Sequence, residues 1–115
     1  MKLAVTIWKN RISPLFDSSR RLQIVDIRKR CVAGVHSIDL DIRSAADRAS
    51  ALAALGVDLL ICGAISSEFL RRIQQKHIDI IPFVSGTLDE VIEAYLSGTL
   101  VNGELSMPGC TLQQL

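Results

Sequence analysis

The sequence predicts a single α/β domain built on a mixed β-sheet. Three apolar runs with strand character come first, and after residue 41 stretches with helical spacing alternate with further apolar runs. The expected order is therefore strand, strand, strand, helix, strand, helix, strand, helix. A chain of 115 residues is long enough for one core and too short for two. We expect one domain over residues 1–105 and a flexible tail over residues 106–115.

The first half of the chain predicts a strand followed by an antiparallel hairpin. Lys2–Trp8 is mostly apolar, and Leu22–Ile27 and Val32–Leu40 are two further strand-like runs. The connection over residues 28–30 is too short for a crossover, so these last two runs are expected to pair antiparallel. Residues 9–20 are polar and irregular. We predict a loop there, of a length that is often functional in a small domain.

The second half of the chain predicts helical crossovers between parallel strands. Asp58–Cys62 is an almost continuous apolar run, typical of a central strand buried on both faces. Right-handed crossovers place this strand beside the first one. The remaining elements are a helix after Asp41 that stops at Gly56, a helix over residues 66–77, a strand over residues 78–84, and a helix that begins at the capping box of Thr87 and Glu90 and ends at Gly98.

Composition excludes several classes of function. The net charge of +1 gives no basic excess for nucleic acid or an anionic membrane surface. No apolar run approaches the length of a membrane span, and no signal peptide is visible. Three cysteines at irregular spacing argue against a disulfide framework and for a reducing compartment. We therefore expect a soluble cytoplasmic protein.

Cys62 is the residue with the strongest case for chemistry. It lies where the central strand ends and a turn leads into a helix, at the edge of the sheet where ligands usually bind. A helix N-terminus nearby favours the thiolate, the nucleophilic and metal-binding form. The alternative, of about equal weight, is a small buried core residue. A phosphatase-type loop would need an arginine six positions later, where the chain has Glu68.

The predicted topology brings the loop over residues 9–17 beside the turn over residues 62–67. Arg11, Ser13 and the amides at the helix start near Ser66 would suit an anion there, and the alternative is an ordinary solvated loop. Cys110 in the tail could supply a second soft ligand or be incidental. The other candidates have better structural explanations: a packing role for Cys31, a satisfied position within the sheet for His36, and capping of the second helix for His77.

The cysteines do not predict a closed metal centre. There is no Cys-x-x-Cys or His-x-His pattern, and a standard cluster takes four thiolates that three scattered cysteines cannot supply. Any metal cluster would therefore bind through few protein ligands, transiently, or between subunits.

Several segments in a fixed order carry a family resemblance. They are Met1–Val5, Arg11–Phe16, Gln23–Asp26, Leu59–Ser66 and Gly86–Gly98. In sequence and spacing the chain resembles the dinitrogenase iron–molybdenum cofactor biosynthesis family of small cluster-binding proteins. The resemblance implies a three-layer α/β/α domain of ribonuclease H-like topology, whose five-stranded mixed sheet has its second strand antiparallel. One departure is Leu15, which stands where the family loop often has histidine.

The resemblance also implies a function. Members of this family resemble non-enzymatic carriers or chaperones of an iron–sulfur or iron–molybdenum cluster, which would work with cluster donor and acceptor proteins. The sequence also leaves a homo-oligomer possible. On that reading Cys62 and Cys110 are the metal ligands. Arg11, Ser13 and the amides near Gly63 and Ser66 hold the cluster's negative charge. The alternatives are a small-anion or protein-partner module without a cluster, and a thiol-dependent enzyme with a base near Cys62.

Overall fold

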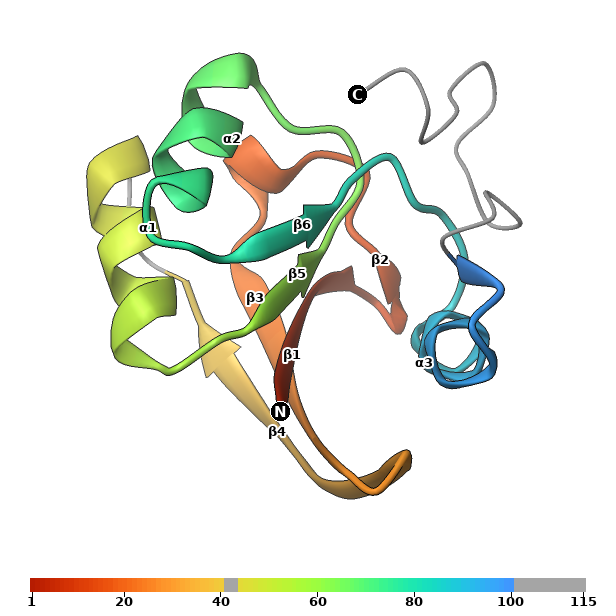
Figure 1. Ribbon diagram of the computed structural model, residues 1–115. Coiled ribbons are helices and arrows are strands. Elements are labelled where there is room, and N and C mark those ends of the chain that lie inside the picture. The colour runs from red at the N-terminus through yellow and green to blue at the C-terminus, as the bar shows by residue number, and fades with distance from the viewer. Residues whose placement is uncertain (41–43, 101–115) are drawn as a thin grey trace.

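A computed structural model describes residues 1–40 and 44–100, which form three layers (Figure 1). A β-sheet makes the middle layer. Helices α1 (Ala45–Ala54) and α2 (Ser67–Gln74) cover one face, and α3 (Leu88–Ser97) covers the other. The predicted α/β class and the mixed sheet are confirmed. None of the helices within these described ranges is long and apolar enough to cross a membrane.

The sheet has the strand order β4-β3-β1-β5-β6, with a short β2 paired to β1 off this path. Strands β1, β5 and β6 are parallel, whereas β3 is antiparallel to both β1 and β4. The predicted hairpin is therefore confirmed, and so is the prediction that the first and central strands are neighbours in the sheet. The strands are β1 (Lys2–Trp8), β2 (Arg11–Ile12), β3 (Arg21–Arg28), β4 (Cys31–Asp39), β5 (Leu59–Ile61) and β6 (Asp79–Ile81).

The sixth strand lies where the sequence predicted only a loop. Lys9 and Asn10 both have positive φ, 50° and 65°, and form a two-residue turn that folds β2 back onto β1. A 3-10 turn, η1 (Phe16–Ser18), follows. The expectation of five strands and an unstructured segment over residues 9–20 was therefore wrong. The last strand is shorter than predicted because Pro82 follows it and Phe83 takes a left-handed φ of 61°.

Two apolar cores lie on the two faces of the sheet. Alternate residues of β1 divide between them: Ala4 faces α1 and α2, whereas Leu3 and Val5 face α3. Leu60 and Ile61 of β5 divide in the same way, so the central strand is buried on both faces as predicted.

Each helix begins with a hydroxyl side chain that caps its first turn. Ser44, Ser66 and Thr87 accept hydrogen bonds from backbone amides of α1, α2 and α3. The Thr87–Glu90 capping box is present, and Gly98 ends α3 with a left-handed φ of 81°. The predicted start and end of the last helix are confirmed.

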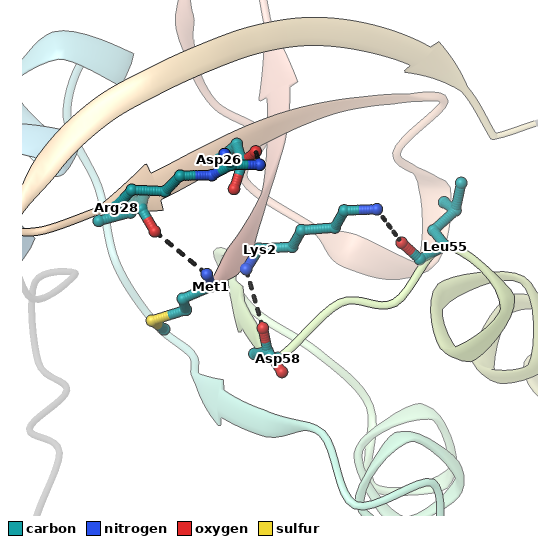
Figure 2. A network of polar contacts seen from close by, with 7 residues as sticks. Met1, Lys2, Asp26, Arg28, Leu55 and Asp58 are labelled. Atoms are coloured by element: carbon teal, nitrogen blue, oxygen red, sulfur yellow. Dashed lines mark hydrogen bonds and ion pairs between the residues drawn. The ribbon is translucent and has the colours of Figure 1, made fainter.

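Polar contacts close the edge of the sheet where β1 begins (Figure 2). The Lys2 amide donates to the Asp58 carboxylate at 2.8 Å, and Lys2 Nζ donates to the carbonyl of Leu55 at 3.0 Å. The amino group of Met1 donates to the carbonyl of Ile27 at 3.1 Å. These contacts join β1 to the end of α1 and to β3. The loops that carry the predicted site therefore lie at the opposite edge.

Candidate functional site

Three loops meet at the carboxyl edge of the parallel strands. The segment after β1 contacts the turn after β5, since the Phe16 amide donates to Ala64 at 2.7 Å and the Ala64 amide donates to Pro14 at 2.8 Å. The segment after β6 joins them through Phe83, whose amide donates to Gly63 at 2.9 Å. The predicted meeting of residues 9–17 with residues 62–67 is confirmed. The loops form one hydrogen-bonded surface.

Gly63 makes the close approach of these loops possible. A Cβ at this position would lie 2.6 Å from the Pro14 carbonyl oxygen and closer still to that of Ser13. Real Cβ atoms essentially never approach a backbone oxygen so closely. The glycine is therefore required by the packing of one loop on the other.

Phe16 and Arg48 hold the first loop from beneath. Phe16 is fully buried, with its ring 5.5 Å from that of Phe69 in an edge-to-face arrangement. Arg48, itself 5% exposed, donates to the carbonyls of Phe16 at 2.7 Å and Ser19 at 2.8 Å. Its guanidinium also lies over both rings, at 5.3 and 5.7 Å. Burial lowers the pKa of Arg48, and the charge of Asp17 opposes that shift.

Sequence reasoning missed Arg48 as a positioning residue. A signal was present, because Arg48 lies three residues after Ala45 and four before Leu52, on the stripe that packs against the sheet. An arginine on such a stripe needs acceptors within the core. The loop carbonyls are those acceptors.

Asp17 occupies the anion position that was predicted at the start of α2. Its carboxylate accepts from the amide of Ser66 at 3.1 Å, and the Ser66 hydroxyl accepts from Phe69 at 3.5 Å. An acidic group at a helix N-terminus is the electrostatically favourable arrangement. An incoming anion would therefore have to displace Asp17 from this amide.

Cys62 is a buried thiol. It is fully buried in the core on the α1 and α2 face. Burial, and secondly the negative charge of Asp17, raises the pKa of Cys62 to about 12. The expectation that the helix would favour a thiolate is wrong, because burial and the charge of Asp17 both favour the protonated thiol.

The raised pKa of Cys62 predicts a loss of stability at high pH. The folded state holds this proton to about pH 12, whereas an unperturbed thiol titrates near 9. Folding is therefore stabilised by the protonated thiol below the unfolded value, and this contribution is lost as pH rises toward 12. We expect the free energy of unfolding, measured in urea, to fall more steeply between these values in the wild type than in Cys62→Ala. The exposed Cys31, changed to alanine, is the matched control. Equal slopes in the wild type and Cys62→Ala would contradict the assignment.

The remaining predicted residues are spread around this edge. Arg11 is exposed, and Ser13 is buried beneath the loop, with its hydroxyl 3.4 Å from the carbonyl of Leu15. Gly63 and Ser66 are engaged as described above, and Cys110 lies outside the described residues. No observation tests these five residues, or Cys62, as ligands, so their roles stay predictions.

Cys31 was expected to have a packing role, and this is wrong, whereas His36 lies in the sheet as expected, opposite Ile24. Both are exposed on β4, because this edge strand extends beyond the cover of the helices. His77 follows α2 with a left-handed φ of 60°, the conformation typical of a helix end.

An apolar and basic surface lies over the joined loops. Leu15 is 41% exposed, and Trp8 is 60% exposed with Lys9 Nζ 4.8 Å from its ring centroid. A cavity of about 430 Å³ lies between the end of β1 and the segment that follows it, and its lining includes an indole, serine hydroxyls and a guanidinium. The lining residues are Ile7, Trp8, Ser13, Pro14, Ser18, Ser19 and Arg20. Such a lining suits an anionic ligand with an apolar part.

The described residues do not by themselves make a metal centre. Within residues 1–40 and 44–100, no group of three or more histidine, cysteine and acidic side chains could hold a metal ion. A thiol protonated at neutral pH is also a poor soft ligand. The described part of this edge can therefore bind a ligand through charge and through a rigid, shaped surface, and it supplies few metal-ligating atoms.

Comparison with solved structures first defines the class of domain. A candidate dinitrogenase of Methanocaldococcus jannaschii superposes with a TM-score of 0.73 at 24% identity, covering 86% of this chain and 90% of that one. The apo form of the orange protein from Desulfovibrio gigas gives 0.71 at 19% identity, covering 85% and 88%. At these identities the likeness shows a shared fold.

The sequence comparison then defines the family. The model of the dinitrogenase iron-molybdenum cofactor family matches residues 1–98. An uncharacterized protein of Methanocaldococcus jannaschii is 29% identical over 105 residues, which cover 87% of this chain and 89% of that protein. The chain belongs to the dinitrogenase iron-molybdenum cofactor family, as its sequence motifs predicted.

Proposed function

We propose that this protein is a non-enzymatic cytoplasmic carrier or chaperone of an iron–sulfur or iron–molybdenum cluster, or of a precursor of one. The cluster is cargo, received from a donor protein and passed to an acceptor. The observation that carries the proposal is the family match over residues 1–98. The finer topology that the resemblance implies, ribonuclease H-like, agrees with the strand order β4-β3-β1-β5-β6.

The surface at the carboxyl edge supports a cargo that is anionic and weakly ligated. Arg20 lines the cavity and Lys9 lies over the ring of the lining residue Trp8, and their charges would attract a cluster with net negative charge. Loops joined by backbone hydrogen bonds need little reordering on binding, which favours a defined docking surface. Few protein ligands would also let the cluster leave readily.

The two proposed soft ligands differ in availability. Cys62 is buried and protonated, so it would bind metal only if the turn over residues 62–67 opened and the proton left. We therefore assign the larger share of metal ligation to Cys110, and we keep for Arg11 and Ser13 the predicted role of holding the cluster's negative charge. The same state of Cys62 weighs against a thiol-dependent enzyme.

Anaerobic reconstitution with iron and sulfide, followed by visible absorption, tests this assignment. The wild type is expected to gain charge-transfer absorption, Cys110→Ala to lose most of it, and Cys62→Ala to retain most of it. Cys31→Ala is the matched control, since Cys31 lies at the far end of β4, and it should behave as the wild type. Equal binding by the wild type and Cys110→Ala would overturn the ligand assignment.

A second candidate is a small-anion or protein-partner module that has kept the fold without the cluster. The exposed Leu15, where the family loop often has histidine, favours it, and so does the buried state of Cys62. Thermal shifts with phosphate, molybdate and nucleotides distinguish the two functions. Stabilisation by one of these anions that Arg20→Gln abolishes, in a protein that takes up no cluster, would establish the second candidate.

A further inference from the structure

The edge strand β4 is unusually open to pairing with another strand. Within residues 1–40 and 44–100, β3 is its only hydrogen-bonded neighbour. Residues 31–37 are all exposed, and Val32 and Val35 are 42% and 46% exposed. The strand contains no proline, lysine or arginine, which are the usual protections of an edge.

One feature of β4 does hinder pairing with another strand, but it affects only the first residues of the strand. The pairing of β4 with β3 shifts register between Asp26 and Ile27, opposite Val32 and Gly34, which marks a β-bulge at Ala33. From Gly34 to Asp39 the ladder is regular. This regular half therefore offers an undistorted edge to a further strand, and a partner that reaches past Gly34 meets the bulge at Ala33.

The exposed valines extend an apolar layer to the rim of the sheet. Val35 pairs with Val25 and Val32 pairs with Ile27, and both of these β3 residues belong to the core beneath α3. Antiparallel partners directly opposite each other point to the same face, so Val32 and Val35 continue this core outward. A partner strand would bury them.

The charges at the two ends of β4 favour one kind of partner. The hairpin turn before the strand carries Arg28, Lys29 and Arg30, all exposed, and the strand ends at the exposed Asp39. An antiparallel copy of the same strand brings the acidic end of each molecule to the basic end of the other, whereas a parallel copy would bring like charges together. Asp39 stays available, since its ion pair with Arg21 is long, at 3.7 Å, and open to solvent.

We propose that a second copy of this chain pairs antiparallel with β4, forming a two-fold symmetric dimer with a continuous sheet. With the axis at Val35, the two Val35 side chains lie opposite each other on the α3 face. Because β4 runs parallel to β1, the two carboxyl edges then point in opposite directions. Each molecule keeps its own candidate site open. The inference is independent of the proposed function.

Sedimentation equilibrium of the full chain under reducing conditions tests the dimer. The wild type is expected to dimerise across a dilution series, and Val35→Lys to weaken the dimer by roughly tenfold or more, because two lysines would meet at the axis. Ala53→Lys adds the same charge to an exposed position on α1 and should leave the dimer unchanged. A monomeric wild type, or a Val35→Lys dimer as tight as that of the wild type, would overturn the proposal.

A charge exchange tests the orientation of the strands. Arg30→Asp should weaken the dimer, and adding Asp39→Arg in the same chain should restore it, a rescue that damage to the fold would not give. Hydrogen exchange adds a second readout: those amides of residues 34–39 that point away from β3 should become protected on dimerisation. Protection of these amides in the monomer would mean that the chain itself covers β4. That result, or a failed rescue, would overturn the proposal.

Discussion

Replacing Arg48 with methionine is expected to destabilise the protein by about 2–5 kcal/mol, because it removes the donor to the buried Ser19 carbonyl and one of the two donors to the Phe16 carbonyl, which keeps the Ser19 amide. The packing of the guanidinium over the rings of Phe16 and Phe69 would also be lost. A loss of this size is a large part of the stability of an ordinary domain. Urea denaturation followed by circular dichroism measures it.

Two further variants make the Arg48 prediction specific. Arg48→Lys keeps the positive charge but cannot reach both carbonyls with a planar fork, so its stability should fall between those of the wild type and Arg48→Met. Arg72→Met removes an exposed arginine from α2 and should change stability by no more than about 0.5 kcal/mol. If Arg48→Met were as stable as Arg72→Met, Arg48 would not hold the loop.

Gly63→Ala is expected to cost about 2–4 kcal/mol, because its methyl group would drive apart the loops joined at Ala64. The loop after β1 would have to move away from the turn after β5, which also breaks the bond from the Ala64 amide to Pro14. Thermal and urea denaturation measure the loss. Hydrogen exchange should show faster opening at Phe16 and Ala64.

Gly34 provides the matched control for Gly63. A Cβ built at Gly34 meets nothing within 4 Å, so Gly34→Ala should be near neutral. Equal stability of the two alanine variants would mean that the loops can separate at no cost. The close packing at Gly63 would then have no part in holding the site.

The sequence pattern was sufficient for the elements that local chemistry determines. The short connection at residues 28–30 predicted the hairpin, the apolar run before Cys62 predicted the central strand, and Thr87 with Glu90 predicted the last helix start. In each case the signal and its cause lie within a few residues of each other. These elements could therefore be predicted without knowing what packs on them.

The interior of the first loop could not be predicted in this way. Its irregular sequence gives no periodic signal, and its structure depends on distant partners: Arg48 below Phe16, and Ala64 beside Leu15. The local turn at Lys9 and Asn10 makes the short strand, and contacts with these distant partners fix the 3-10 turn that follows.

Whether each cysteine is buried depends on which strands and helices pack around it. The alternation of apolar and polar residues along a strand does not reveal this packing. Cys62 ends a strand flanked by β1 and β6 beneath α1 and α2, so its thiol is buried and protonated. Cys31 begins an apolar-looking edge strand whose residues 31–37 are all exposed. The segments around Cys31 and Cys62 both have the sequence pattern of a packed strand. Only the order of strands in the sheet shows that one is at the edge and the other in the centre.

The most direct test of the proposed function is the metal content of the protein purified without oxygen. The proposal predicts iron and inorganic sulfide, with or without molybdenum, in stoichiometric amounts that fall sharply in Cys110→Ala and persist in Cys31→Ala. Wild-type protein that contains no iron or molybdenum when purified, and takes up none on anaerobic reconstitution, would contradict the carrier function.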